Sequence, residues 1–229
     1  STALMGLLYF VLRDTRLNHR RCGLEWKFIG HSFINGSPEF INESAAGIMV
    51  FFYNMILIRL AGETGVAAGA IVLQIHYLFM SIHMGYQVGC MPLISYYYGA
   101  SRPDRIDKTM RYTRNYMAVS SVAMAGLCAL LAPLIVRVYT SAGTALYDMS
   151  VYGLRLVSLS LLVVGINVFA SGFFTCFGNG LISSLIALSR GLVMLILGLL
   201  VLSHFFGLTG AWLALPFADW TTLILSFAM

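Results

Sequence analysis

The sequence predicts an all-α protein, a polytopic bundle of six membrane-spanning helices. Hydrophobic residues make up 59% of the 229 residues, charged residues make up only 10%, and the mean hydropathy is +0.83. A soluble domain carries about a quarter charged residues. A water-soluble fold of this size could not bury so much apolar surface, so we expect lipid to be the solvent for much of the chain.

Six apolar stretches each reach the roughly 20 residues that a helix needs to cross a bilayer. Glycine-containing turns separate three pairs of them, at 61–65, 178–180 and 207–210. Because unpaired backbone groups are not tolerated in hydrocarbon, apolar runs of this length are predicted to be helices. The six predicted spans are 38–60, 66–95, 115–136, 151–177, 181–202 and 208–229.

The chain divides into three predicted regions. Residues 1–12 are apolar and uncharged, and we interpret them as the remnant of a preceding transmembrane helix. Residues 13–37 are predicted to form a cytoplasmic loop. Residues 38–229 are predicted to form the six-helix domain. The helix stub at 1–12 precedes it as a separate apolar segment.

Basic residues lie on one side of the predicted topology. Eleven of the fourteen are Arg190 and the ten basic residues of the 13–37 and 99–114 loops. The other three are Arg59, Arg137 and Arg155. The positive-inside rule therefore places these two loops and the C-terminus in the cytoplasm of a multi-pass protein of the plasma or inner membrane. Since topology explains the net charge of +5, we expect no nucleic-acid partner.

Several polar side chains lie inside the predicted helices, where insertion of a charged group costs about 2.5–3.5 kcal/mol. Glu43 and Asn54 are eleven residues apart, which is three helical turns, so they share one face. His76 and His83 share a face of the next helix, and Asn167 lies in the fourth. Either these residues hydrogen-bond between helices, or they line a cleft that binds a substrate and a proton or cation. Glu43 is the strongest candidate for the second role.

Arg190 and Asp219 lie in the last two predicted helices. Counted from the turn near Phe206, their depths differ by only about 5 Å at 1.5 Å per residue. Neighbouring antiparallel helices joined by a short loop usually pack together. The two residues are therefore predicted to form a structural ion pair that binds no substrate.

No motif in the sequence indicates an enzyme. The chain has no Gly-x-Ser-x-Gly, no His-Glu-x-x-His and no phosphate-binding glycine loop, so we predict no catalytic residues. An intramembrane protease is the alternative from the enzyme class, but its Gly-x-Ser-Gly element is absent and His76 and His83 share one helix. The four cysteines show no Cys-x-x-Cys spacing, and we expect no metal site, disulfide or cofactor.

Four stretches resemble the multidrug and toxic compound extrusion (MATE) family. They are GSPEFI at 36–41 followed by Asn54, GYQVGCMPLISYYYGA at 85–100, GINVFASGFFTCFGNGLISSLIALSR at 165–190, and GLTGAWLALPFADWTT at 207–222. They resemble parts of the seventh, eighth, tenth with eleventh, and twelfth helices of these transporters. The resemblance runs from about residue 28 to the end of the chain.

The resemblance implies that this chain is the C-terminal lobe of a twelve-helix transporter, with residues 13–37 linking it to a missing N-terminal lobe of the same chain. Such transporters export small organic cations by alternating access, driven by inward flow of H⁺ or Na⁺. Glu43 is the nearest candidate for a coupling carboxylate on the seventh helix, and Asn167 stands on the tenth, where some members have an acidic residue. The alternatives are a lipid-linked oligosaccharide flippase of the same superfamily and a membrane subunit without transport activity.

Overall fold

The computed structural model describes residues 26–177, 185 and 188–228. Every regular element in these ranges is helical, and they contain no strand, which confirms the predicted all-α class. The chain divides into two units, Ser1–Phe33 and Ile34–Met229, and the arrangement below is that of the second unit. Its elements are α2 (Trp26–Gly99, which begins in the first unit), α3 (Pro103–Val136), α4 (Ala145–Val157), α5 (Leu161–Cys176), the π-helical turn η1 (Ser189–Val193) and α7 (Met194–Ala228).

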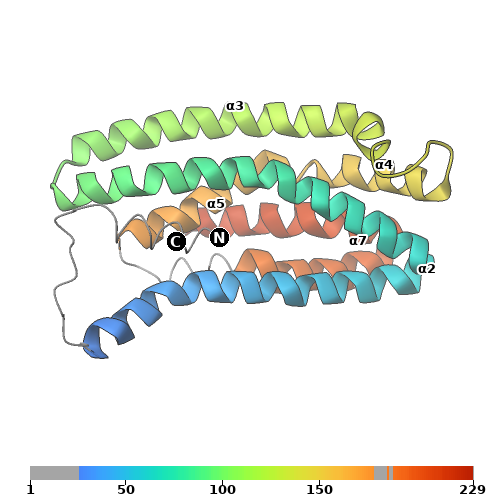
Figure 1. Cartoon of the computed structure of the whole chain (residues 1–229), viewed down its shortest axis with the longest axis horizontal. Helices are drawn as coiled ribbons and strands as arrows, with labels where there is room; N and C mark the ends of the chain where they lie inside the picture. The colour runs from blue at the N-terminus through green and yellow to red at the C-terminus, as the bar shows by residue number, and fades with distance from the viewer. Residues whose placement is uncertain (1–25, 178–184, 186–187, 229) are drawn as a thin grey trace, which may run out of the picture. The chain divides into compact units, whose positions relative to one another are not determined.

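Two glycines reverse the direction of the longest helices. Gly62 in α2 has φ 63° and ψ −155°, and Gly207 in α7 has φ 57° and ψ −131°. These angles lie in a region that only glycine adopts without strain. Figure 1 shows that each helix turns back on itself at this point, so that α2 and α7 each consist of a first arm and a second arm. The breaks predicted at 61–65 and 207–210 are confirmed.

The charged stretch before the third predicted span is helical rather than a loop. α3 begins at Pro103, whereas the span was predicted to begin at residue 115 and residues 99–114 to form a loop. Pro103 and Asp104 explain this early start, because proline suits the first helical position and a carboxylate stabilises the positive end of a helix. α2 likewise begins at Trp26, within the predicted 13–37 loop. Both helices continue past their apolar segments because only the hydrocarbon crossing needs apolar side chains.

The fourth predicted span is broken. The prediction of one continuous helix over 151–177 is wrong, because α4 and α5 are separated at residues 158–160 and meet at an angle of 55°. The break contains neither glycine nor proline. Ser160 precedes α5 but makes no capping hydrogen bond to it, so its hydroxyl is available to other helices.

Three described helices are long and apolar enough to cross a membrane, or four if the bent pair α4 and α5 counts as one. Since α2 and α7 each reverse once, the predicted spans correspond to the two arms of α2, to α3, to the bent pair and to the two arms of α7. The 178–180 turn, the start of the 181–202 span and the 1–12 stub lie outside the described residues. Many large apolar side chains point outward, among them Phe51 (66% exposed), Leu130 (79%) and Phe205 (73%). Such a surface suits lipid rather than water.

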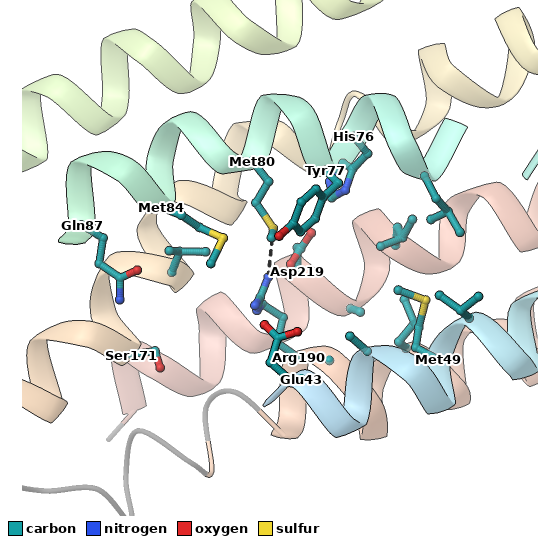
Figure 2. A pocket seen from close by; sticks show the side chains of 18 of the residues that line it. Glu43, Met49, His76, Tyr77, Met80, Met84, Gln87, Ser171, Arg190 and Asp219 are labelled. Atoms are coloured by element: carbon teal, nitrogen blue, oxygen red, sulfur yellow. Dashed lines mark hydrogen bonds between the residues drawn. The ribbon is translucent and has the colours of Figure 1, made fainter. Parts of the chain in front are cut away.

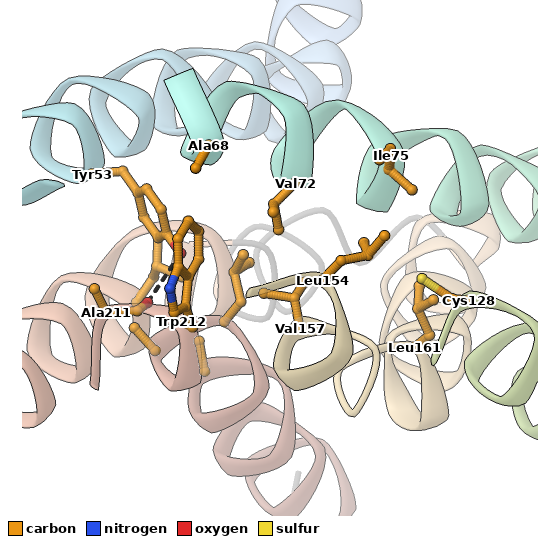
Figure 3. Packing of buried hydrophobic residues seen from close by; sticks show 14 of the residues in the cluster. Tyr53, Ala68, Val72, Ile75, Cys128, Leu154, Val157, Leu161, Ala211 and Trp212 are labelled. Carbon is orange, nitrogen blue, oxygen red and sulfur yellow. Dashed lines mark hydrogen bonds between the residues drawn. The ribbon is translucent and has the colours of Figure 1, made fainter. Parts of the chain in front are cut away.

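The core lies where α2, α4, α5 and α7 meet, and α3 packs against α4 and α5. Trp212 of α7 and Tyr53 of α2 are its largest fully buried side chains, with their ring centroids 6.2 Å apart. Leu154 of α4, Leu161 of α5 and Cys128 of α3 extend the same cluster (Figure 3). The core therefore holds together α2, α4, α5 and α7, the helices that carry or adjoin the cavity described next.

Candidate functional site

A cavity of about 710 Å³ lies within the second unit, between both arms of α2, the C-terminal half of α5, η1 and α7. This volume is within the range of small-molecule sites, about 300–1,000 Å³. Its wall is mainly apolar and rich in methionine. Figure 2 shows Arg190 and Asp219 close together in it, with Gln87 and Ser171 farther away. Its polar and charged lining residues are Glu43, Asn54, Gln74, His76, Tyr77, Gln87, Ser171, Thr175, Arg190 and Asp219.

Three of the predicted cleft residues line this cavity. Glu43 and Asn54 come from the first arm of α2, with Glu43 exposed and Asn54 half-buried, and His76 comes from the second arm and is buried. The reversal at Gly62 brings the two arms together, which is why Glu43 and His76, 33 positions apart in the sequence, share one cavity. The helical spacing of Glu43 and Asn54 thus corresponds to a shared face on the cavity wall.

The other two predicted cleft residues do not line it. His83 is buried against α3, where its Nε2 lies 3.3 Å from the hydroxyl oxygens of both Ser120 and Ser121. Asn167 is also buried, and its amide donates a hydrogen bond of 2.7 Å to the backbone carbonyl of Asp219. Both residues hold neighbouring helices together, which is the alternative role that the sequence left open.

Arg190 and Asp219, predicted as a structural pair, both face the cavity. Arg190 lies in the π-helical turn η1, a kind of irregularity that is frequent at functional sites. Its Nη1 lies 3.7 Å from the sulfur of Met80 and donates a weak hydrogen bond to it. Among the residues that the structure describes, no N–O distance of 4.0 Å or less joins Arg190 to Asp219. Their direct pairing therefore stays a prediction.

Asp219 instead has a hydroxyl partner that the sequence did not single out. Ser160, fully buried at the break before α5, donates a hydrogen bond to Oδ2 of Asp219. Its Oγ also lies 3.0 Å from Nε2 of His76. The only signal in the sequence is a serine within an apolar run, which is common in membrane helices and too weak to indicate a site.

The charges in the cavity are mixed. Glu43 and Asp219 supply two carboxylates, Arg190 supplies the single guanidinium of the described lining, and His76 adds an imidazole. Within the described ranges, no group of three or more His, Cys, Asp or Glu side chains has the arrangement to hold a metal ion. Chemically, the site combines an apolar wall with charged and polar groups, an arrangement that suits an amphipathic molecule.

Comparison with known proteins identifies the family. The profile of the MatE family matches residues 40–200, well over half of the chain. No curated protein sequence matches. Among solved structures, the chain is similar to a MATE protein in complex with MaL6 (20% identity, TM-score 0.90). It is also similar to a multidrug resistance MATE family transporter of the MOP superfamily in an outward-facing conformation (21%, 0.89) and to a MOP superfamily transporter from Pyrococcus furiosus (21%, 0.89).

Each of these three alignments covers 99% of this chain and 52% of the other protein, so the chain spans about half the length of the structures that it matches. At these identities the structures establish the fold, and the profile match establishes the family. The apolar helices and the outward-facing hydrophobic surface agree with both. The chain is an integral membrane protein and belongs to the MatE family.

Proposed function

We propose that this chain is one lobe of a cation-coupled antiporter that exports small organic cations across the plasma or inner membrane. The observation that carries the proposal is the cavity of about 710 Å³, which has an apolar wall, two carboxylates and one guanidinium. A second lobe closes it from the opposite side, and alternating exposure of the cavity to the two sides of the membrane moves the substrate.

The lining favours amphipathic cations over anionic lipids. Its methionines, Met49, Met80, Met84 and Met91, are flexible and polarisable and can adapt to flat apolar molecules of different shape. Tyr77 adds an aromatic ring that attracts cations. A lipid-linked oligosaccharide flippase would need several cations for its anionic headgroups, whereas the described lining supplies one.

Glu43 is proposed as the coupling group that binds H⁺ or Na⁺. It stands at an exposed position on the cavity wall, where ions and substrate both reach it. An ion on Glu43 and a cationic substrate beside it compete for the same negative charge, and this competition is the basis of exchange. The basic segments at 13–37 and 99–114 and the C-terminus face the cytoplasm in this proposal, as the positive-inside rule predicts.

The test is Glu43→Gln in the full-length transporter, expressed in cells that lack their own exporters. Glutamine keeps the size and hydrogen bonding of the side chain but cannot carry the charge cycle. Ion-driven export of a cationic dye should be lost while the amount of protein in the membrane is unchanged. Glu63→Gln is the matched control, because Glu63 lies exposed beside the Gly62 turn and does not line the cavity. Wild-type export from Glu43→Gln at equal protein level would overturn the assignment.

A further inference from the structure

We propose that His76, Ser160 and Asp219 form a relay that binds one proton inside the bundle, apart from Glu43. The inference rests on the proposed antiport function and makes the proton its coupling ion. The three residues come from three segments that are distant in sequence: the second arm of α2, the break before α5, and the second arm of α7. All three are buried, with exposed fractions of 7%, 0% and 3%.

The direction of the hydrogen bonds follows from the single hydroxyl proton of serine. Ser160 donates that proton to the carboxylate of Asp219, so its oxygen can only accept from His76. Nε2 of His76 therefore carries a hydrogen in this state, and Nδ1 holds the lone pair. The result is an ordered chain from imidazole to hydroxyl to carboxylate.

The hydrogen-bonded series His76–Ser160–Asp219 can transfer a proton without a large movement of any heavy atom. A proton that reaches Nδ1 of His76 from the cavity makes an imidazolium, whose Nε2 proton passes to Ser160 as the hydroxyl proton of Ser160 passes to Asp219. One proton has entered, Asp219 is a neutral acid, Ser160 is unchanged, and His76 is neutral again with its hydrogen on Nδ1. Release runs through the same steps in reverse.

The surrounding charges limit the relay to one proton. Arg190 of η1 lines the same cavity as His76 and Asp219, so its positive charge acts on both. With Asp219 ionised, this guanidinium and the carboxylate balance, and each added proton raises the local charge by one. Figure 2 shows Arg190 between Asp219 and Glu43. When Asp219 is neutral, Glu43 is the remaining carboxylate near Arg190. A proton bound in the relay therefore strengthens the attraction between Arg190 and Glu43. Tyr77, also on the second arm of α2, lines the same cavity.

The relay also lies at a mechanical joint. Asp219 is held at two points: Ser160, in the break before α5, donates to its carboxylate, and the side-chain amide of Asn167, in α5, donates to its backbone carbonyl over 2.7 Å. Ser160 belongs to the break where α4 and α5 meet at 55°. Protonation of Asp219 turns the carboxylate from an acceptor into a donor at this joint. Protonation of Asp219 therefore changes how α7 packs against the bent pair α4 and α5.

Infrared difference spectroscopy of the full-length protein in lipid nanodiscs, recorded as the pH is lowered, tests the relay. Wild type should show a carboxylic-acid C=O band that appears together with a change of a histidine ring from the Nε2–H to the Nδ1–H tautomer. Labelling with ¹³C-histidine identifies the ring band. Asp219→Asn should lose this C=O band. Ser160→Ala should keep the C=O band but separate it from the tautomer change, while Ser160→Thr, which retains the hydroxyl, restores their coupling.

The chain supplies matched controls at a second histidine–serine contact, between α2 and α3. His83 lies seven residues from His76 and contacts Ser121 rather than the relay, so His83→Gln and Ser121→Ala should leave both bands unchanged. Persistence of the C=O band in Asp219→Asn would overturn the proposal. So would a tautomer change that still follows the C=O band in Ser160→Ala. If Asp219→Asn fails to fold, the two Ser160 variants still decide.

These spectra require neither substrate nor transport. Loss of dye export in Glu43→Gln with no titration at Asp219 would remove the relay and leave the antiport function standing. A titrating relay with wild-type export from Glu43→Gln would remove the role of Glu43 and leave the relay standing. The two failures are thus distinguishable.

Discussion

The hydroxyl of Tyr53 donates a hydrogen bond of 3.0 Å to the backbone carbonyl of Ala211 and so joins the first arm of α2 to the second arm of α7. Tyr53 is fully buried beside Trp212. Tyr53→Phe removes the hydroxyl and leaves the ring in place, so we expect the free energy of unfolding to fall by about 0.5–1.5 kcal/mol. Chemical unfolding of the purified protein in detergent measures this difference.

Tyr96→Phe is the control for that change. Tyr96 belongs to the same helix but is 70% exposed, and no hydroxyl hydrogen bond to another helix involves it in the described structure. It should leave the free energy of unfolding unchanged within error. Equal losses in the two variants would show that the Tyr53 hydrogen bond does not stabilise the packing of α2 on α7.

Gly153 of α4 lies against the Trp212 ring. A Cβ atom at this position would lie 2.8 Å from Cδ2 and 2.9 Å from Cε2 of Trp212, which is fully buried and has no space to retreat. Gly153→Ala should therefore lower the free energy of unfolding by about 1–3 kcal/mol through overpacking. Gly126→Ala in α3, where nothing lies within 4 Å of the added Cβ, should be neutral or slightly stabilising. A neutral Gly153→Ala would contradict the close contact.

The fold class and the turns at Gly62 and Gly207 were predictable from the sequence because each rests on local chemistry. Apolar runs of the right length predict helices, and glycine predicts the reversals at Gly62 and Gly207. The break at Ser160 was not predictable, since no residue there disfavours helix and the bend depends on packing against other helices. The helical start at Pro103 does not follow from charge, because a charged stretch can be either a loop or a helix that continues beyond the apolar segment.

The candidate site was predicted only in part, for a related reason. Helical spacing placed Glu43 and Asn54 on one face, and the structure shows that this face lines the cavity. The same spacing grouped His76 with His83, yet the second arm of α2 directs His83 toward α3 and His76 toward Ser160. Periodicity identifies a shared face on one helix, whereas the partner of each residue depends on how the neighbouring helices pack.

Arg190 and Asp219 are predicted to stabilise each other through their charges. Removal of one partner leaves a poorly solvated charge in the bundle, whereas removal of both leaves none. We expect Arg190→Gln and Asp219→Asn each to lower the amount of folded protein in the membrane more than the double variant does. Fluorescence-detected size-exclusion chromatography of the four proteins at one pH measures this. Additive losses in the double variant would mean that the two charges do not interact.

The reversal at Gly62 gives the last prediction. Its φ of 63° and ψ of −155° place it in a region that is essentially restricted to glycine, and an L side chain there costs of order 1–3 kcal/mol. No heavy atom lies within 4 Å of an added Cβ, so steric contact with neighbours does not contribute. Gly62→Ala should therefore lower the free energy of unfolding through backbone strain alone.

Gly47→Ala separates this backbone strain from the loss of a glycine as such. Gly47 also has no heavy atom within 4 Å of an added Cβ, but it lies within the regular part of α2. Alanine is the better helix former by about 1 kcal/mol, so Gly47→Ala should raise the free energy of unfolding while Gly62→Ala lowers it. Thermal unfolding in one detergent compares the two variants directly. If both shifted stability in the same direction, the reversal of α2 at Gly62 would not depend on its left-handed backbone.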